Sequence, residues 1–467
     1  MATDRSECER EAERMRAALC RPAERVTLRE QRGAHGVVWT AGELSDCAHA
    51  VARVLENVST PETSAPAGAA PVGVYVRSPL HLAASIVGCW QARRMPVLLD
   101  PGSKSEIDQL AEACPGIRLL AAPDHVPPRG ALIVDAFGGR AATRTSLRAP
   151  AAGEWAVAFF TSGSEGRAKL VPKRARQVYA HVGSASAMLA LPQGCRALCF
   201  VPLFHILGFS YGFAAPLLAG GESFVLLEAL PHALKDALLA YKPDLVVATA
   251  VQYRFLNTVL SPHDAAPDAV YISSGAPLPA RERDTFARLT GRTITELYGS
   301  TETAGIAWRR GDTPWRPYPG AEVKLDGERV CVRSPWADPE RVDAFVATHD
   351  AGEPDGDGFR LLGRAGTIVK VGGKRFSALE VEQALRSHRG VEDAACVPHE
   401  RNGEPALAAF VVLDAGATLT AADLRAHLAS QLAPFKVPRT LHLVPSLPRR
   451  KLQKLDYAEL RRLAERE

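Results

Sequence analysis

Six residues in one short segment have the types that bind phosphate: Thr161, Ser162, Gly163, Ser164, Gly166 and Lys169. They follow the apolar run 155–160, which is typical of a buried strand. Small residues let backbone N–H groups converge on an anion, and the hydroxyls and the lysine add donors and positive charge. The glycines are too close together for a Walker A loop, and no Lys-Ser or Lys-Thr follows. A phosphate-binding loop of another type is predicted, although a plain surface turn has a similar composition.

Four more segments carry residues that suit nucleotide chemistry. The turn Ser274-Gly275-Ala276-Pro277 suits backbone contact with a flat base, and Tyr298-Gly299-Ser300-Thr301-Glu302 sets an acid beside hydroxyls. Asp350 offers a carboxylate for a ribose diol, with Arg364 as a cation further along the chain. The basic run 448–454 contains Lys454.

Each of these residues also has an ordinary structural interpretation. Glu302 can assist a helix cap, and Asp350 can form a turn. His205 can be a core histidine, and the run that holds Lys454 can be a solvated surface. Any one segment alone is weak evidence of function.

The elements that would position these residues follow an α/β pattern. A strand at 72–76, a helix at 81–92 and a strand at 96–101 form a βαβ unit, which indicates a parallel sheet. Further short buried strands are predicted at 197–201, 223–227, 245–248 and 269–272. Because α/β proteins bind ligands where parallel strands end, the loop after residue 160 is well placed.

The pattern changes near residue 320. Segments 321–325 and 329–333 alternate like antiparallel strands, and a smaller α/β unit of about a hundred residues follows, with a helix at 420–432. The sequence therefore predicts a multidomain α/β protein, divided into an N-terminal core of residues 1–363 and a C-terminal domain of residues 364–467.

Composition narrows the class of protein. The 467 residues are 46% hydrophobic and 23% charged, with a net charge of +4, so nothing indicates a nucleic-acid binder. The nine cysteines are scattered and odd in number, which favours free thiols in a reducing compartment. The first seven residues are polar where a signal peptide needs an apolar core, and no apolar run approaches the ~18 residues of a membrane span. A cytoplasmic protein without a membrane span is expected.

In this order and at these separations, the five segments resemble the adenylate-forming superfamily of AMP-dependent acyl- and aryl-acid ligases and acyl-CoA synthetases. The resemblance covers about residues 70 to 460. It implies a large N-terminal domain of α/β subdomains with parallel sheets and a small β-barrel-like region, followed by a mobile α+β lid that turns about a hinge after Gly363-Arg364.

The resemblance also implies residue roles. Lys454 would be the catalytic lysine, Thr301 would touch the α-phosphate, Glu302 would hold Mg²⁺, and His205 would stand beside the acid. Residues that would bind ATP are Thr161, Ser162, Gly163, Ser164, Gly166, Lys169, Ser274, Gly275, Ala276, Pro277, Tyr298, Gly299, Asp350 and Arg364. Residues that would line the acid pocket are His205, Ile206, Leu207, Ser210, Ser274, Leu297, Gly305 and Ile306.

The implied reaction activates a carboxylic acid with ATP and Mg²⁺ and passes the acyl group to CoA or to the phosphopantetheine thiol of an acyl carrier protein. Family members that activate amino acids place an aspartate beside the substrate's ammonium, where this chain has Ile206 or Leu207. The ammonium of an amino acid would be left unpaired there, so an aryl or medium-chain acid is expected. Gly305 is expected to leave depth in the pocket. The net charge of +5 after residue 433, from nine Lys/Arg and four Asp/Glu, would suit an acidic carrier protein.

Local features look similar to the short AMP-ligases of aryl polyene and xanthomonadin-type pigment clusters, which are thought to activate hydroxybenzoate-like acids. They include Val171-Pro172-Lys173, the segment 315–320 and the segment 373–377. A medium-chain fatty acyl synthetase is the alternative. Glu165, Gly366 and Gln453 depart from the family pattern and keep open a catalytically degenerate sensor of nucleotide or acid. A P-loop kinase fits the loop spacing poorly.

Overall fold

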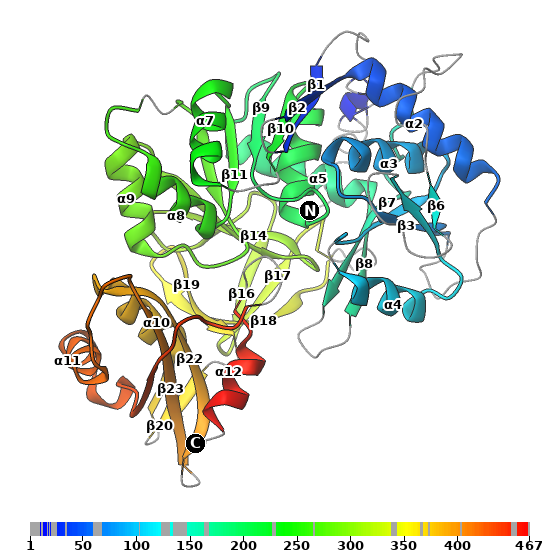
Figure 1. Ribbon diagram of the computed structural model, residues 1–467. Helices are drawn as coiled ribbons and strands as arrows, with labels where there is room; N and C mark the ends of the chain where they lie inside the picture. Colours follow the sequence, from blue (N-terminus) through cyan, green and yellow to red (C-terminus); the bar gives the residue numbers. More distant parts are fainter. Residues whose placement is uncertain are drawn as a thin grey trace.

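Two large sheets form the N-terminal part of the molecule, and a smaller unit at the C-terminus lies against one side of it (Figure 1). The computed structural model describes residues 10, 13–15, 17, 19, 26–32, 35–58, 68–101, 103–122, 131–133, 147–162, 168–226, 230–264, 267–337, 343–364, 368–371, 374–401, 404–449 and 455–465. Among these, no helix is long and apolar enough to cross a membrane.

The first sheet has six strands in the order β6-β5-β3-β4-β7-β8. Its strands are β3 (Pro71–Tyr75), β4 (Met95–Leu98), β5 (Arg118–Ala121), β6 (Leu132–Ile133), β7 (Trp155–Ser162) and β8 (Ala168–Arg174). Strands β3 and β4 are parallel and are joined by helix α3 (Pro79–Gln91), which confirms the predicted βαβ unit. Helix α2 (Ala41–Glu56) packs on α3, and α4 (Lys104–Ala113) contacts β7 and β8. Thr40 and Glu43 have the spacing of a capping box, and this box opens α2.

The second sheet has nine strands in the order β15-β14-β13-β12-β11-β9-β10-β1-β2. They are β1 (Val26–Arg32), β2 (His35–Thr40), β9 (Arg196–Cys199), β10 (Glu222–Leu226), β11 (Leu245–Ala248), β12 (Val270–Ser273), β13 (Ile294–Ser300), β14 (Ala304–Arg310) and β15 (Arg316–Pro317). The accompanying helices are α5 (Ala175–Met188), the π-helix η1 (Gly208–Ala214), α6 (Ala215–Leu218), α7 (Pro231–Tyr241), α8 (Ala250–Val259) and α9 (Ala280–Thr290). Strands β9, β11, β12 and β13 run parallel, so their carboxyl ends share one edge.

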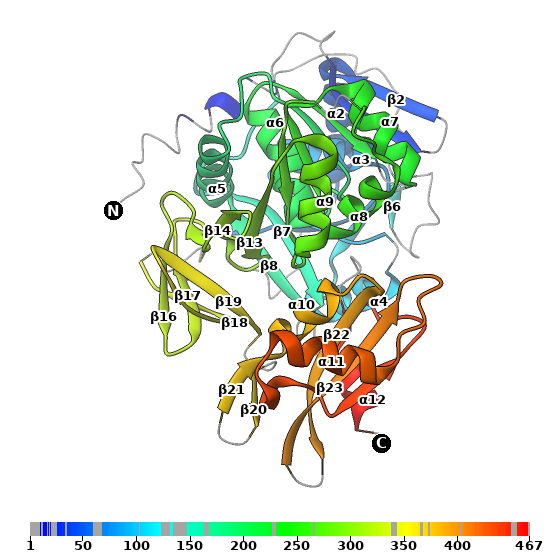
Figure 2. The same cartoon turned by 90° about the vertical axis from the view of Figure 1, so that its left-hand side faces the viewer.

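An antiparallel sheet of four strands follows in the order β16-β17-β18-β19. The strands are β16 (Glu322–Asp326), β17 (Arg329–Arg333), β18 (Val346–Asp355) and β19 (Gly358–Arg364). It packs on β14 through Ile306, Trp315 and Phe359, which belong to one buried cluster. Figure 2 shows this sheet beside β13 and β14.

The C-terminal unit has its own cores, whose buried residues all come from position 369 onward. It contains β20 (Ile368–Val371), β21 (Lys374–Ser377), α10 (Ala378–Ser387), β22 (Val391–Arg401), β23 (Glu404–Leu413), α11 (Ala421–Gln431), η3 (Pro434–Lys436), β24 (Thr440–Leu443) and α12 (Tyr457–Ala464). Thr420 and Asp423 form a capping box before α11. Ser377 and Glu380 also have the spacing of a capping box. Ser377 caps α10, but the carboxylate of Glu380 binds Lys436 instead of closing the box.

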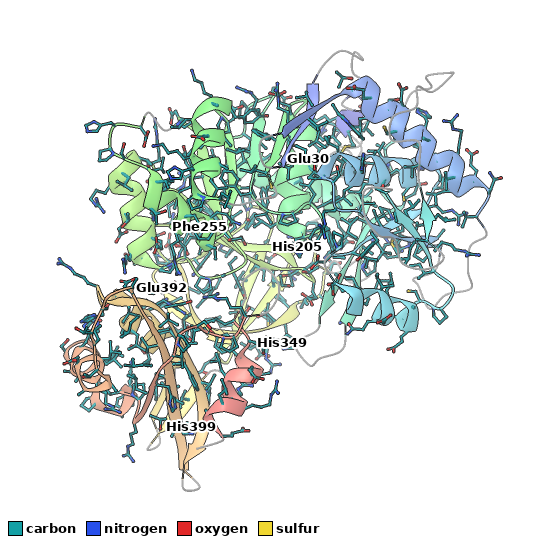
Figure 3. All side chains as sticks on the ribbon, in the orientation of Figure 1. Glu30, His205, Phe255, His349, Glu392 and His399 are labelled. Atoms are coloured by element: carbon teal, nitrogen blue, oxygen red, sulfur yellow. The ribbon has the colours of Figure 1, made fainter. Side chains whose placement is uncertain are left out.

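Ion pairs join the C-terminal unit to helices α8 and α9. Arg254 lies 3.9 Å from Glu392, and Arg281 lies 3.3 Å from Asp414. Glu392 stands at the edge of the C-terminal unit that faces these helices, whereas His205 lies inside the N-terminal part (Figure 3). The unit is therefore held to the core by partly exposed charges.

Candidate active site

The predicted phosphate loop connects two antiparallel strands, β7 and β8. Strand β7 continues to Ser162, two residues beyond the apolar run, because β8 pairs with it in antiparallel register and sets Thr161 opposite Lys169. Residues 163–167, which include the predicted Gly163, Ser164 and Gly166, lie outside the described residues. Lys169 is exposed and is the second residue of β8.

Three predicted segments meet at the carboxyl edge of the second sheet. His205 follows β9, Ser274 follows β12, and Thr301 follows β13. The hydroxyl of Ser274 donates a hydrogen bond of 2.8 Å to the carbonyl of Leu297, which ties the loop after β12 to β13. Residues 275–277 are exposed, and Gly275 has φ +88°, a conformation that favours glycine. Exposed backbone at this edge can contact a flat base.

Tyr298 and Asp350 connect the predicted adenine and ribose sites. The phenol hydroxyl of Tyr298 donates a hydrogen bond of 2.7 Å to Oδ2 of Asp350. The backbone N–H of Asp350 also donates to the hydroxyl of Thr348, which is buried and donates in turn to the carbonyl of Val330. Arg364 pairs with Asp350 in the β18–β19 register, although its side chain lies outside the description. The carboxylate of Asp350 is thus held in place and keeps one oxygen for a ligand.

An Asp350→Asn variant is expected to raise the KM for ATP. Loss of hydrogen bonds from ribose hydroxyls to a charged oxygen should cost about 1.5–3 kcal/mol, or roughly a 10- to 100-fold increase. Steady-state kinetics with ATP and with 2′,3′-dideoxy-ATP check this, because the variant should discriminate less between them than the wild type. Tyr298→Phe is the matched control, since it frees the carboxylate without removing its charge. Unchanged discrimination in Asp350→Asn would contradict the ribose role.

Glu302 lies in the turn between β13 and β14, with an exposed side chain. The hydroxyls of Ser300 and Thr303 are 3.0 Å apart and shape this turn. No group of three or more His, Cys, Asp or Glu gathers into a metal site in the described part of the chain. Mg²⁺ is commonly held by one or two carboxylates together with substrate phosphates and water. An exposed carboxylate beside hydroxyls fits that manner of binding, and Glu302 would hold the ion.

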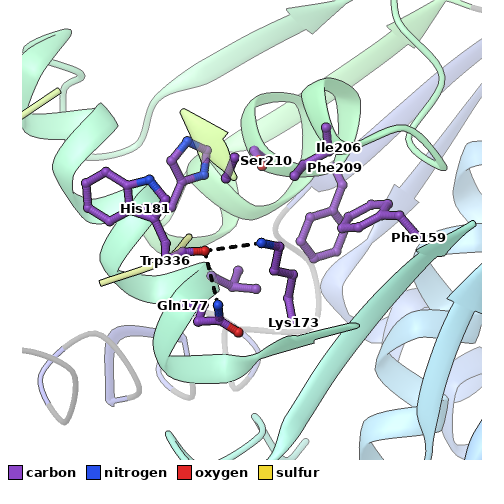
Figure 4. A pocket seen from close by; sticks show the side chains of 10 residues that line it. Phe159, Lys173, Gln177, His181, Ile206, Phe209, Ser210 and Trp336 are labelled. Carbon is purple, nitrogen blue, oxygen red and sulfur yellow. Dashed lines mark hydrogen bonds between the residues drawn. The ribbon is translucent and has the colours of Figure 1, made fainter. Parts of the chain in front are cut away.

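A small cavity lies between the two sheets (Figure 4). Its lining residues are Phe159, Lys173, Gln177, Val178, His181, Ile206, Phe209, Ser210, Ala304 and Trp336. Ile206 and Ser210 were predicted pocket residues, and the other eight were missed. His205 and Leu207 are partly buried beside them, whereas Leu297 and Ile306 pack into the core. Val171-Pro172-Lys173 stood out in the sequence, but nothing there indicated that Lys173 faces this cavity.

The expectation that Gly305 leaves depth was wrong. A Cβ atom at Gly305 would lie 2.8 Å from Nε2 of His181 and 2.8 Å from Cζ of Tyr318. The backbone N–H of Gly305 donates to His181 Nε2, and its carbonyl accepts a hydrogen bond of 2.8 Å from Trp336. The hydroxyls of Tyr318 and Tyr211 are 2.9 Å apart behind it. Glycine is needed here for close packing, and two aromatic rings fill the space.

Burial lowers the pKa of His181 from its usual 6.5 to about 3, and the nearby charge of Lys173 acts in the same direction. His181 therefore stays neutral at physiological pH. Since Nε2 accepts the hydrogen bond from Gly305, its proton is assigned to Nδ1.

The stability of the protein is expected to fall as the pH drops below 6.5. The unfolded chain takes up a proton at His181 there, but the folded chain does so only near pH 3. The free energy of unfolding should fall by at most about 1.4 kcal/mol per pH unit from this group. Urea unfolding of wild type and His181→Gln between pH 4 and 7 checks this, since glutamine keeps an acceptor but does not titrate. Parallel curves for the two proteins would contradict the assignment.

The predicted catalytic Lys454 lies outside the described residues, as do Glu165, Gly366 and Gln453. The side chains of Thr161 and Ser162 are not described either. The chain on either side of residues 450–454 is anchored, because Arg449 and Leu455 form an antiparallel bridge. Arg449 also pairs with Asp393, which is buried and binds Arg386.

The AMP-binding enzyme family model matches residues 15–340, and the model of the AMP-binding enzyme C-terminal domain matches residues 380–454. The chain belongs to this family of adenylate-forming enzymes.

Among curated proteins, the chain is 28% identical to a long-chain-fatty-acid–CoA ligase of Bacillus subtilis, with 64% of this chain and 60% of the relative aligned. It is also 28% identical to an anthranilate–CoA ligase of Pseudomonas aeruginosa, with 82% and 85% aligned. The chain spans 60–64% of the length of the first curated relatives it matches.

The fold is that of known adenylate-forming enzymes. The structure of ATP-bound MatB from Rhodopseudomonas palustris superposes with a TM-score of 0.81 at 21% identity, covering 97% of this chain and 99% of that one. The predicted α/β architecture, with a large N-terminal part and a small C-terminal unit, is confirmed.

Proposed function

We propose that this chain is an AMP-forming acid–thiol ligase that acts on a small aryl acid. The observation that carries the proposal is the meeting of His205, Ser274 and Thr301 at one sheet edge, with Tyr298 holding Asp350 beside them. A base, a ribose and an α-phosphate could then be bound in the order that the nucleotide requires. ATP, Mg²⁺ and CoA are used generally by enzymes of this family.

In the first step, a carboxylate oxygen of the acid attacks the α-phosphorus of ATP, and pyrophosphate leaves. Thr301 would contact the α-phosphate, the loop of residues 161–169 would hold the leaving phosphates, and Lys454 would bridge the reacting anions. When bound, Mg²⁺ supplies positive charge that offsets charge on the phosphates. In the second step, a thiolate sulfur attacks the acyl carbon and AMP leaves.

The C-terminal domain of residues 364–467 would act as a lid that carries Lys454. Its few partly exposed ion pairs with α8 and α9 suit a domain that must turn between the two steps.

The aromatic lining of the small cavity between the sheets favours an aryl acid. The rings of Phe159 and Phe209 lie 5.5 Å apart in its wall, and Trp336 forms another side. Ser210 and the neutral His181 add hydrogen-bonding groups that could bind a ring hydroxyl, as in a hydroxybenzoate. The extensive alignment with an anthranilate–CoA ligase supports the same class.

Acid-dependent exchange of pyrophosphate into ATP tests the proposal. The panel contains benzoate, hydroxybenzoates, anthranilate, medium-chain fatty acids, malonate and amino acids. We expect the strongest exchange with a hydroxybenzoate and AMP as the product. Strong exchange with fatty acids alone would favour the acyl synthetase, and ATP binding without exchange would favour a sensor. Transfer assays with CoA and with a phosphopantetheinylated carrier protein then identify the acceptor, for which we propose a carrier protein.

A further inference from the structure

Lys173 reaches across the cleft between the two sheets to three backbone carbonyls. Its side chain is only 3% exposed, and its ammonium donates to the carbonyl of Glu302, to that of Trp336 at 3.1 Å and to that of Ala337 at 3.5 Å. An ammonium has three donors, so these carbonyls can take all three. The partners are 129, 163 and 164 residues away in the chain.

Burying an ammonium is costly unless its environment compensates for lost water. A hydrogen bond that joins these segments does not require a charged donor, because a neutral amide makes one to the same carbonyl. Gln177, on α5, also donates a hydrogen bond of 3.1 Å to the carbonyl of Trp336, as Figure 4 shows. Lys173 makes two contacts that Gln177 lacks, to the carbonyls of Glu302 and Ala337, and only the first of them involves a predicted site residue.

The position of Lys173 in the fold explains why its contact with Glu302 matters. Lys173 lies on β8, the strand that leaves the predicted phosphate loop, and Glu302 lies in the turn after β13 of the other sheet. The ammonium therefore connects the strand that positions the phosphates to the backbone of the residue that would hold Mg²⁺. The carbonyl of Glu302 is directed at Lys173, and its carboxylate is exposed.

We propose that Lys173 is a positioning residue, which fixes the backbone of Glu302 relative to the phosphate loop and so sets the affinity of the site for MgATP. The inference rests on the proposed function, because it requires Glu302 to hold the ion. Lys173 does not touch the metal or the substrate phosphates in this role. It acts through Glu302.

The test compares Lys173→Met with Gln177→Leu. Isothermal titration calorimetry without acid measures the binding of MgATP and, in EDTA, of ATP alone. We expect Lys173→Met to weaken MgATP binding about tenfold or more and to leave metal-free ATP binding close to that of the wild type. Its pyrophosphate release should need more Mg²⁺ and should recover when Mg²⁺ is raised, which a general loss of structure would not produce.

Gln177→Leu is the matched control, because it removes a bond to the same carbonyl of Trp336 but none to Glu302. It is expected to lower the melting temperature and to keep the wild-type Mg²⁺ dependence. The inference is overturned if Lys173→Met binds MgATP like the wild type, if it loses metal-free ATP equally, or if Gln177→Leu shows the same shift. Should Lys173→Met not fold, Lys173→Gln, whose side chain is one atom shorter and so does not reach the carbonyl of Glu302 as the ammonium does, is measured with the same outcomes.

Glu302→Gln separates this inference from the proposed function. A shifted Mg²⁺ requirement in Glu302→Gln with none in Lys173→Met overturns the role of Lys173 alone. No shift in Glu302→Gln overturns the metal role of Glu302 and the inference that depends on it.

Discussion

A Lys454→Ala variant is expected to lose acid-dependent pyrophosphate release by about 10²- to 10³-fold, the usual effect of removing one group that stabilises transition-state charge. A carboxylate must approach a polyphosphate in this step, so the reacting groups repel each other. A cation that bridges the carboxylate and the α-phosphate offsets charge exactly where the new bond forms. Pyrophosphate release at saturating ATP and acid measures the loss.

Two controls make the Lys454 result specific. Lys451→Ala removes a charge from the same basic run and should keep nearly full activity. Transfer from a synthetic acyl-adenylate to the thiol should also survive in Lys454→Ala, because that step no longer involves the pyrophosphate. Unchanged pyrophosphate release, or an equal loss in Lys451→Ala, would refute the assignment of Lys454.

A Glu302→Gln variant is expected to reduce the rate of adenylation by about 10²-fold and to raise the Mg²⁺ concentration needed for half-maximal rate. Glutamine keeps the size of the side chain but removes the negative charge that attracts a divalent cation. The backbone contact with Lys173 does not depend on the carboxylate, so the fold should be preserved. Initial rates over a range of Mg²⁺ concentrations, with a melting curve for each protein, provide the measurement.

Glu322→Gln serves as the control for Glu302, because Glu322 is an exposed acid on β16 that pairs with Arg333. Its Mg²⁺ curve should coincide with that of the wild type. A Glu302→Gln enzyme whose curve also coincides would show that the ion is held elsewhere.

Local sequence signals predicted the elements well. Short apolar runs such as 155–160 became buried strands, and Thr40 and Thr420 are the N-caps of α2 and α11, as their sequence positions indicate. These signals depend on neighbours within a few residues, so one sequence contains them in full. At Ser377 the N-cap formed, but the reciprocal bond from Glu380 did not. The carboxylate of Glu380 binds Lys436, which comes from a distant part of the chain.

The walls of the candidate site depend on distant partners, and these were predicted less well. The sequence around Lys173 is typical of a surface residue in an alternating strand. The carbonyls that it binds nevertheless belong to turns that lie 129 and 163 residues further along the chain. Gly305 suggested empty space because glycine lacks a side chain. The space is filled by His181, on α5, and by Tyr318. No periodicity or motif encodes such contacts, since they arise only when the sheets pack.

The antiparallel strands β7 and β8 on either side of the proposed phosphate loop affect how phosphate charge would be neutralised there. In a Walker A protein, the loop leads directly into a helix whose N-terminus attracts the phosphates. Here the chain continues into β8, and α5 begins only at Ala175. This connection therefore contributes no helix dipole to the proposed phosphate site, and the polyphosphate would depend more on side-chain charge and bound ions. Such interactions are screened by dissolved salt, so ionic strength should strongly affect nucleotide affinity in this enzyme.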